Sequence, residues 1–263
     1  MNRIIARYED QVYHPGELTA DSENTAKARA ALTADPGNVS LLNDLAAALK
    51  AQLRYYEAAE CYSEILKQNP FNREILCRRG HMYIGLRKYQ EASVDLEMGL
   101  RLDPYDWDCL YHNGLCYYLL GDYETAEEYY RRCYAASCSE EDLTAVSDWL
   151  WLTLMHLDRE EEAAAVVDAI GTDGWDYGEN AAYYARLLVY KGVKDAGETL
   201  RAAREMSSFD FCTYAYGIAY YLYKVKGEKA KAEALLAELS GLTESQWGGF
   251  ALQAAQAAMK RGL

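Results

Sequence analysis

The sequence predicts an all-α protein built from paired helices that stack into a solenoid, and three observations carry this prediction. More than half of the 263 residues are apolar, so the chain can bury a large core. Only four prolines interrupt it, which favours long helices. Three of them, Pro36, Pro70 and Pro104, are equally spaced along the chain. Other columns keep the same interval: Gly80 and Gly114; Tyr55, Tyr89 and Tyr123; Ala58, Ala92 and Ala126.

Each repeated unit is predicted to form two amphipathic helices joined by a turn. In the unit 73–106, apolar or small side chains recur at helical spacing, at Leu76, Gly80 and Tyr83. A second such series begins with Ala92, after the turn. Gly80 and Ala92 are expected where the two helices cross, because small side chains let the helix axes approach closely. The proline near the end of the unit stops the second helix.

This pattern resembles the tetratricopeptide (TPR) repeat, whose period is about 34 residues, and the segment GLCYYLLGDYETAEEYYRRC carries it best. Its residues on the family's positions are Gly114, Tyr117, Gly121, Tyr123 and Ala126. The resemblance implies a right-handed α-α superhelix, a TPR-like α-solenoid, with about six helix-turn-helix pairs and capping helices at its ends. Arg79 and Asn113 depart from the family, which usually has Leu there, so looser packing or packing through the Arg stem is expected.

The resemblance extends over residues 1–263 as a single solenoid with four parts. Residues 1–38 are expected to form an atypical N-terminal helix pair, at 2–14 and 21–34. The three clear repeats cover 39–140. Residues 141–241 hold degenerate repeats, with a loop at 171–180. A last helix within 242–263 is expected to cap the array, since a solenoid needs polar caps on its ends.

Charge and composition argue against several classes of function. The chain carries 27 basic and 41 acidic residues, a net charge of −14, which disfavours nucleic acid and anionic membranes as partners. The longest uncharged stretch, 245–259, is shorter than the roughly 20 residues of a membrane helix. The start of the chain lacks an apolar export signal. Seven cysteines without a CxxC pair favour reduced thiols. We therefore expect a cytoplasmic protein.

The sequence contains no motif for catalysis, a metal or a cofactor. None of its four histidines belongs to a zinc-binding motif. The glycine-containing loop at 171–180 lacks Lys and has three acidic residues, so it cannot cradle phosphates. Asp103, Asp106 and Asp108 are interpreted as charges that complement the dipole of a helix start. We therefore expect no enzyme, no metal and no cofactor.

Several side chains are expected on the concave face that the family uses for binding. Tyr111 and Tyr118 lie seven residues apart in one helix, as do Tyr214 and Tyr221, and tyrosine suits a peptide groove because its body is apolar and its tip polar. The whole predicted groove comprises Asn43, Lys50, Cys77, His81, Tyr111, Leu115, Tyr118, Asp148, Leu152, His156, Tyr214, Tyr221 and Lys224. An alternative role for each of these is packing on the neighbouring repeat.

By resemblance, the chain is expected to be a scaffold that binds a peptide segment or protein surface in its groove. Some TPR proteins grip acidic C-termini through a clamp rich in cations; those positions hold Asn43, Ala47, Arg78, Asp108 and His112 here. Because one cation remains, we expect an apolar or modestly basic segment instead. The alternatives are a stand-alone regulator of the peptide-sensing kind that acts on a protein partner, or a self-associating structural adaptor. The oligomeric state expected is a monomer or weak homodimer.

Overall fold

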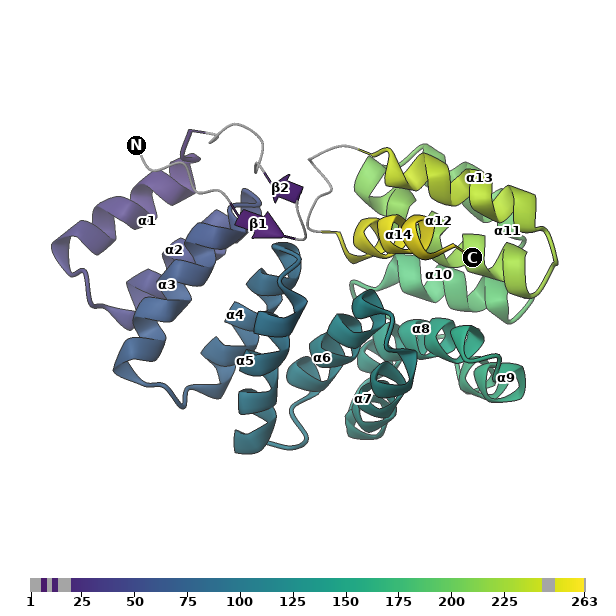
Figure 1. Cartoon of the computed structure of the whole chain (residues 1–263), viewed down its shortest axis with the longest axis horizontal. Coiled ribbons are helices and arrows are strands. Elements are labelled where there is room, and N and C mark those ends of the chain that lie inside the picture. The colour runs from purple at the N-terminus through teal and green to yellow at the C-terminus, as the bar shows by residue number, and fades with distance from the viewer. Residues whose placement is uncertain (1–5, 9–10, 14–19, 243–248, 263) are drawn as a thin grey trace. The chain divides into compact units, whose positions relative to one another are not determined.

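The computed structural model describes residues 6–8, 11–13, 20–242 and 249–262, and their regular secondary structure is helical apart from one short hairpin (Figure 1). The bounds of the fourteen helices in these residues are α1 (Glu23–Ala34), α2 (Val39–Ala51), α3 (Tyr55–Gln68), α4 (Arg73–Gly85), α5 (Tyr89–Leu102), α6 (Trp107–Leu120), α7 (Tyr123–Ala136), α8 (Glu140–His156), α9 (Glu160–Asp168), α10 (Ala181–Tyr190), α11 (Ala196–Arg204), α12 (Ser208–Lys224), α13 (Lys229–Ser240) and α14 (Phe250–Arg261). Helices α2 to α13 make six consecutive pairs, which confirms the predicted all-α repeat fold. None of the described helices is long and apolar enough to cross a membrane.

The start of the chain differs from its prediction. Strands β1 (Ala6–Tyr8) and β2 (Gln11–Tyr13) pair antiparallel, with Ala6 opposite Tyr13 and Tyr8 opposite Gln11. The expected helix at 2–14 is therefore wrong for these six residues, and the rest of it lies outside the described part. Tyrosine and valine favour strands, and a segment this short repays little of the cost of helix nucleation. The second expected helix of this pair, at 21–34, is α1.

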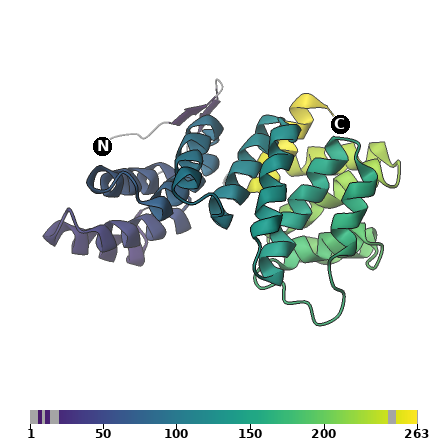
Figure 2. The ribbon, with the colours of Figure 1, turned by 90° about the horizontal axis from the view of Figure 1, so that it is seen from below.

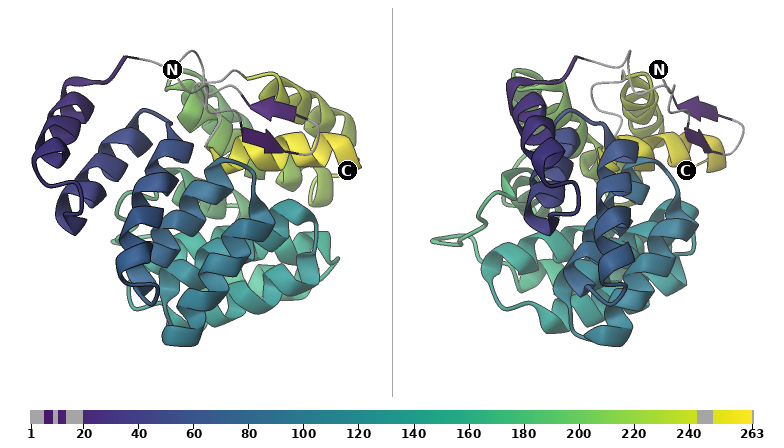
Figure 3. Two further views of the ribbon diagram at one scale, coloured as in Figure 1. Left: turned by 60° about the vertical axis from the view of Figure 1, so that its left-hand side comes forward. Right: turned by 90° about the vertical axis from the view of Figure 1, so that its left-hand side faces the viewer.

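The described residues group into two compact units, residues 1–116 (unit 1) and 117–263 (unit 2), with the division inside α6. In unit 1, α1 lies beside α2 and α2 beside α3 (Figure 3). In unit 2, α8, α10 and α12 pack on one another, and α14 packs on α12 and α13. The predicted loop 171–180 joins α9 to α10 (Figure 2), and it is held against the start of α8 by hydrogen bonds from Trp175 Nε1 to Thr144 Oγ1 at 2.8 Å and from the Asp176 amide to Glu140 Oε2 at 2.6 Å. A single solenoid over 1–263 stays a prediction.

Small residues sit where the paired helices cross, as the repeat pattern predicts. A Cβ added at Gly80 would lie 2.9 Å from Leu96 Cγ and 3.3 Å from the carbonyl oxygen of Ala92, so α4 and α5 are as close there as a glycine permits. The repeated alanines Ala58, Ala92 and Ala126 are fully buried. The prediction of a close crossing is therefore confirmed.

Polar pairs compensate for the two departures from the repeat pattern. Arg79 Nε and Nη2 each donate to the Asp95 carboxylate at 2.7 Å, which ties α4 to α5. Asn113 Nδ2 donates to Glu97 Oε1 at 2.8 Å. Since Asp95 is buried, its charge needs this bidentate partner. Hydrogen-bonded pairs thus occupy the places where the family usually packs leucine.

Candidate functional site

The first helices of the pairs in unit 1 share one face, here called the inner surface and defined by Asn43, Ala47, Lys50, Arg78, His81 and Asp108. Asn43 Oδ1 accepts a hydrogen bond of 2.6 Å from Arg78, which joins α2 to α4. Lys50 is exposed, but desolvation and the charge of Arg78 lower the pKa of its ammonium group, against the opposing charge of Asp108. The side chains of α2, α4 and α6 therefore meet on one surface.

The other predicted groove residues of unit 1 lie deeper. Tyr111 is buried and stacks on Trp107, with ring centroids 4.9 Å apart. Leu115 is fully buried and supports the surface from beneath. His81 is half-buried, and its ring lies 4.6 Å from that of His112. Burial, together with the charge of His112, holds the pKa of His81 well below its usual value, so this ring is neutral at pH 7.

Cys77, also predicted in the groove, belongs to a buried cluster beneath the inner surface with Cys109 and His112. The hydrogen bond from Cys109 lowers the pKa of Cys77 to about 6 against the effect of burial, and His112 adds to this. The same hydrogen bond and burial raise the pKa of Cys109. Burial alone would lower the pKa of His112, but its hydrogen bond to Cys77 and the charge of that thiolate outweigh burial and raise it. The cluster thus favours the thiolate form of Cys77 beside the His112 ring.

In unit 2, several predicted groove residues form an aromatic core. The Tyr118 and Tyr216 hydroxyls are hydrogen-bonded at 2.6 Å, and the Tyr118 hydroxyl lies 3.2 Å from His156 Nε2. His156 stacks on Tyr123 with centroids 3.9 Å apart. Burial lowers the pKa of His156 to about 3, with help from the charge of Lys224, so the ring is neutral. These rings join α6 and α7 to α8 and α12.

A buried ion pair occupies the centre of this unit. Asp148, predicted in the groove, is fully buried, and its Oδ2 lies 2.8 Å from Nη2 of the fully buried Arg186, away from the ideal hydrogen-bond direction. Arg186 Nε donates to the Tyr190 hydroxyl at 3.0 Å, and Nη1 donates to the Thr213 carbonyl at 3.1 Å. Burial raises the pKa of Asp148 to about 7 against the charge of Arg186. Leu152, also fully buried, packs in the same layer.

The last predicted groove residues lie at the edge of unit 2, where α14 covers part of it. Tyr221 is buried and Tyr214 half-buried. Lys224 Nζ donates to Asp158 Oδ1 at 2.7 Å. Arg261 of α14 donates to the Leu119 carbonyl. Within the described residues, most of the predicted groove side chains of unit 2 are thus buried in its interior.

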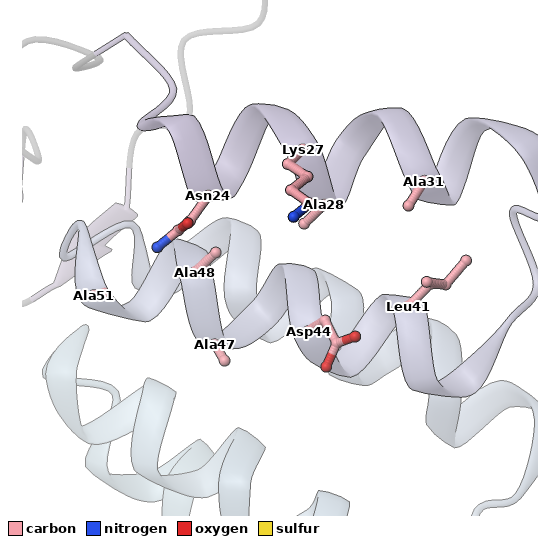
Figure 4. A pocket seen from close by; sticks show the side chains of 9 residues that line it. All are labelled: Asn24, Lys27, Ala28, Ala31, Leu41, Asp44, Ala47, Ala48 and Ala51. Atoms are coloured by element: carbon pink, nitrogen blue, oxygen red, sulfur yellow. The ribbon is translucent and has the colours of Figure 1, made fainter.

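An open groove lies instead between α1 and α2 in unit 1 (Figure 4). Its volume is about 480 Å³, within the roughly 300–1,000 Å³ of small-molecule sites. The lining is mostly alanine, with three polar side chains: Asn24, Lys27, Ala28, Ala31, Leu41, Asp44, Ala47, Ala48 and Ala51. Ala47 belongs to the inner surface as well, so the groove and that surface are continuous.

Polar contacts at the N-terminal end of α1 hold this helix in place. Thr25, its one buried residue, donates to Gln52 Oε1 at 2.5 Å, and the Ser22 amide donates to the same oxygen at 3.1 Å. Arg29 pairs with Glu57 of α3 at 2.5 Å. Because these polar contacts position α1, its alanines are not needed as a packed core and stay open along the groove.

A second cavity, of about 510 Å³, lies between α7, α8 and α9 of unit 2. Leu150, Ala165 and Val166 form part of its lining. Arg131 and Glu162, which also line it, form an ion pair of 2.5 Å across it. A ligand would have to displace this pair, so the α1/α2 groove is the better candidate for an apolar partner.

Comparisons with known proteins place the fold. No family model matches the sequence. The TPR repeat-containing protein MJ0798 of Methanocaldococcus jannaschii is 35% identical over 68 residues, which are 26% of this chain and 20% of that protein's length. A tetratricopeptide repeat protein from Parabacteroides merdae superposes with a TM-score of 0.55 at 18% identity, covering 88% of this chain and 91% of its own. PilW, a type IV pilus biogenesis factor, superposes with a TM-score of 0.53 at 20% identity, covering 84% of this chain and 87% of the PilW chain.

The class of protein follows from the repeat and the fold together. The described part of the chain holds six consecutive helix pairs, α4 and α5 cross closely at Gly80 and Ala92, and solved TPR proteins share the arrangement over most of the chain. The chain therefore has the helical-repeat fold of tetratricopeptide-repeat proteins, and 68 of its residues are similar in sequence to one of them.

Proposed function

We propose that the chain is a non-catalytic interaction scaffold, which binds a segment of another protein in the α1/α2 groove and along the adjoining inner surface of unit 1. The observation that carries this proposal is the open, alanine-lined groove, since a binding scaffold needs an apolar surface that its own fold leaves unfilled. The aromatic core of unit 2 supports the same choice, because most of the predicted groove side chains of that unit are buried and offer a partner little surface.

The groove suits apolar side chains bounded by a polar rim. Alanines along both helices form a shallow floor that larger apolar side chains of a partner can fill. Burying one such side chain contributes about 1.5–3 kcal/mol. Asn24, Lys27 and Asp44 stand at the same groove and supply the few polar contacts that fix the orientation of a bound segment.

Charge favours a segment that is neutral or modestly basic. Unit 1 holds 13 basic and 17 acidic residues, which gives a net charge of −4. Unit 2 holds 14 basic and 24 acidic residues, which gives a net charge of −10. On the inner surface, Arg78 is already bonded to Asn43 and Glu74. An acidic tail would therefore meet few available cations, and the negative field of the chain speeds encounter with basic segments.

We further place the chain in the cytoplasm as a monomer or weak homodimer. The seven cysteines are free thiols, which fits a reducing compartment. Roles as a stand-alone regulator of a protein partner and as a self-associating adaptor would both use the same groove, and identifying the bound segment separates them.

A selection from a displayed random-peptide library tests the proposal. Peptides enriched on the full chain are expected to be apolar with few acidic residues. The variants Ala31→Arg and Ala47→Arg each place a cation in the groove. Each should weaken the binding of the selected peptides by about tenfold or more, which equals about 1.4 kcal/mol or more of binding free energy. The matched control Ala30→Arg changes another exposed alanine of α1 that does not line the groove.

Affinity measured by fluorescence polarisation decides between the outcomes. Circular dichroism checks that all three variants keep their helices. The proposal is contradicted if Ala31→Arg and Ala47→Arg bind the selected peptides as tightly as Ala30→Arg does, since the groove would then make no contact.

A further inference from the structure

We propose that Cys77, Asp106, Cys109 and His112 form a zinc-binding site in unit 1. Cys77 lies on α4, Asp106 directly precedes α6, and Cys109 lies in the first turn of α6. One ligand atom of each, two sulfurs and a carboxylate oxygen, lie within 4.8 Å of one another. All three side chains are buried, so this is an assembled interior cluster and not a chance gathering of surface groups.

The donor set and its size fit zinc. Zinc in proteins prefers tetrahedral sites of thiolate and imidazole ligands, completed in some sites by carboxylate. A Zn–S distance of about 2.3 Å places two sulfurs of a tetrahedron about 3.8 Å apart. The edges to the carboxylate oxygen would be slightly shorter, so edges of up to 4.8 Å need to contract by about 1.3 Å at most, a movement within the range of side-chain adjustment.

His112 is not among the three residues whose ligand atoms lie within 4.8 Å of one another, but its ring is hydrogen-bonded to the Cys77 thiol, and from that side it moves in as the fourth ligand. Its Nδ1 lies 2.7 Å from the carbonyl oxygen of Asp108 one turn earlier in α6, so Nδ1 carries the proton that this oxygen accepts. Nε2 is then the ring nitrogen left for a metal. Metal-binding histidines usually donate their other N–H in this way, to a carbonyl or carboxylate.

Further contacts orient the carboxylate and balance the charge. Asp106 Oδ1 accepts a hydrogen bond of 2.7 Å from the Cys109 amide, and Oδ2 forms an ion pair with Arg73. Two thiolates and one carboxylate bring three negative charges against the two positive charges of Zn²⁺. The guanidinium of Arg73 offsets the remaining negative charge, which lowers the cost of a charged site with little solvent access.

The cluster is absent from the neighbouring repeats at equivalent positions. Asn72 and Asn38 stand one and two repeat lengths before Asp106, and both cap their helices as Asp106 does. The position of Cys109 is held by Leu41 and Ile75 in those repeats. Helix capping and core packing therefore do not require the soft donors found between α4 and α6. Cys77 and Cys109 belong to different repeats, so no short sequence motif announces the site.

Titration of the reduced, metal-free full chain with Co²⁺ tests the site, because cobalt takes the zinc geometry and reports its ligands by absorption. We expect one equivalent of Co²⁺ to give the visible bands of a tetrahedral ion and a near-ultraviolet band from two thiolates, and Zn²⁺ to displace it. Cys77→Ser and Cys109→Ser should each remove about half of the thiolate band. Each should also weaken binding by about tenfold or more, equal to about 1.4 kcal/mol or more.

Two further variants keep the test independent of folding. Asp106→Asn retains a capping side chain of the kind that Asn38 and Asn72 provide, and should weaken cobalt binding while leaving the helical signal unchanged. The control Cys116→Ser removes another fully buried thiol of α6 and should leave the cobalt spectrum unchanged. Failure of the wild-type chain to give a tetrahedral cobalt spectrum would overturn the proposal. So would a spectrum that persists in Cys77→Ser and Cys109→Ser, or oxidation of the two thiols to a disulfide with no metal bound.

Discussion

Replacing Arg186 by Met is predicted to destabilise unit 2 strongly. The guanidinium is fully buried between α8 and α12, and its charge lies 5.5–5.8 Å from the ring centroids of Trp149, Tyr183 and Tyr216. Methionine keeps much of the volume but removes the partner of Asp148. Breaking a buried ion pair in this way costs about 3–5 kcal/mol, because one charge is left buried without a partner. We expect a loss of that size in the free energy of unfolding at pH 8.

The loss should shrink as the pH falls. Burial already raises the pKa of Asp148 to about 7, and Arg186 is the charge that opposes this rise. Without Arg186 the carboxyl group in the folded variant binds its proton at still higher pH, and protonation removes the unpaired charge. The unfolded chain binds this proton only near pH 4. Between those values the folded variant holds more protons than the unfolded one, so its stability falls as the pH rises.

Urea unfolding at pH 5.5 and pH 8, followed by circular dichroism and tryptophan fluorescence, measures both effects. The double variant Asp148→Asn with Arg186→Met removes both charges and should recover a large part of the stability lost at pH 8. A cost of less than about 1 kcal/mol for Arg186→Met at pH 8, a size typical of an exposed pair, would refute the reasoning. A double variant no more stable than the single one would refute it as well.

Two other substitutions test the packing of the repeats. Ala126→Leu places a large side chain at a fully buried helix crossing and should cost about 1–3 kcal/mol, seen as a lower urea midpoint. Tyr118→Phe leaves the Tyr216 hydroxyl without its 2.6 Å partner and should cost about 1–3 kcal/mol, whereas adding Tyr216→Phe should restore most of the loss in the same assay. An unshifted midpoint for Ala126→Leu would show that its repeat register is wrong, and equal stability of the single and double tyrosine variants would exclude the hydrogen bond as the cause.

The sequence predicts the helical repeat because its determinants are local. A glycine at position 80 and alanines at 92 and 126 set the helix crossings whatever the rest of the chain does. Asn38 and Asn72 cap the helices that follow them through their own side chains. Each of these effects acts within one pair of helices, so the regular spacing of these residues is enough to recover the three pairs of residues 39–140, whereas the later pairs are indicated by their helical periodicity.

Whether the predicted groove side chains are open to a partner or buried could not be predicted in the same way, because this depends on contacts between distant parts of the chain. Helical spacing puts Tyr118 on the inner side of its helix, but its partner Tyr216 is 98 residues away. Asp148 meets Arg186 from another pair of helices. Helical periodicity gives the direction in which a side chain points, but it does not say whether the space that the side chain points into is open or is filled by other residues.

The α1/α2 groove escaped prediction for a different reason. Helix α1 buries only Thr25 and has no strong apolar stripe, so its sequence does not indicate what it packs against. Its place is set by polar contacts to Gln52 and Glu57, which are visible only in three dimensions. The alanines of α1 and α2 are the one sequence feature that points to a shallow surface there.

Hydrogen exchange of the full chain, with and without a peptide selected on it, tests the central claim most directly. The amides that report on the groove lie in residues 24–31 and 41–51. We predict that bound peptide slows exchange there and in the adjoining part of α4, and leaves α8, α10 and α12 unchanged. Protection confined to unit 2, or to helices that do not line the groove, would contradict the account.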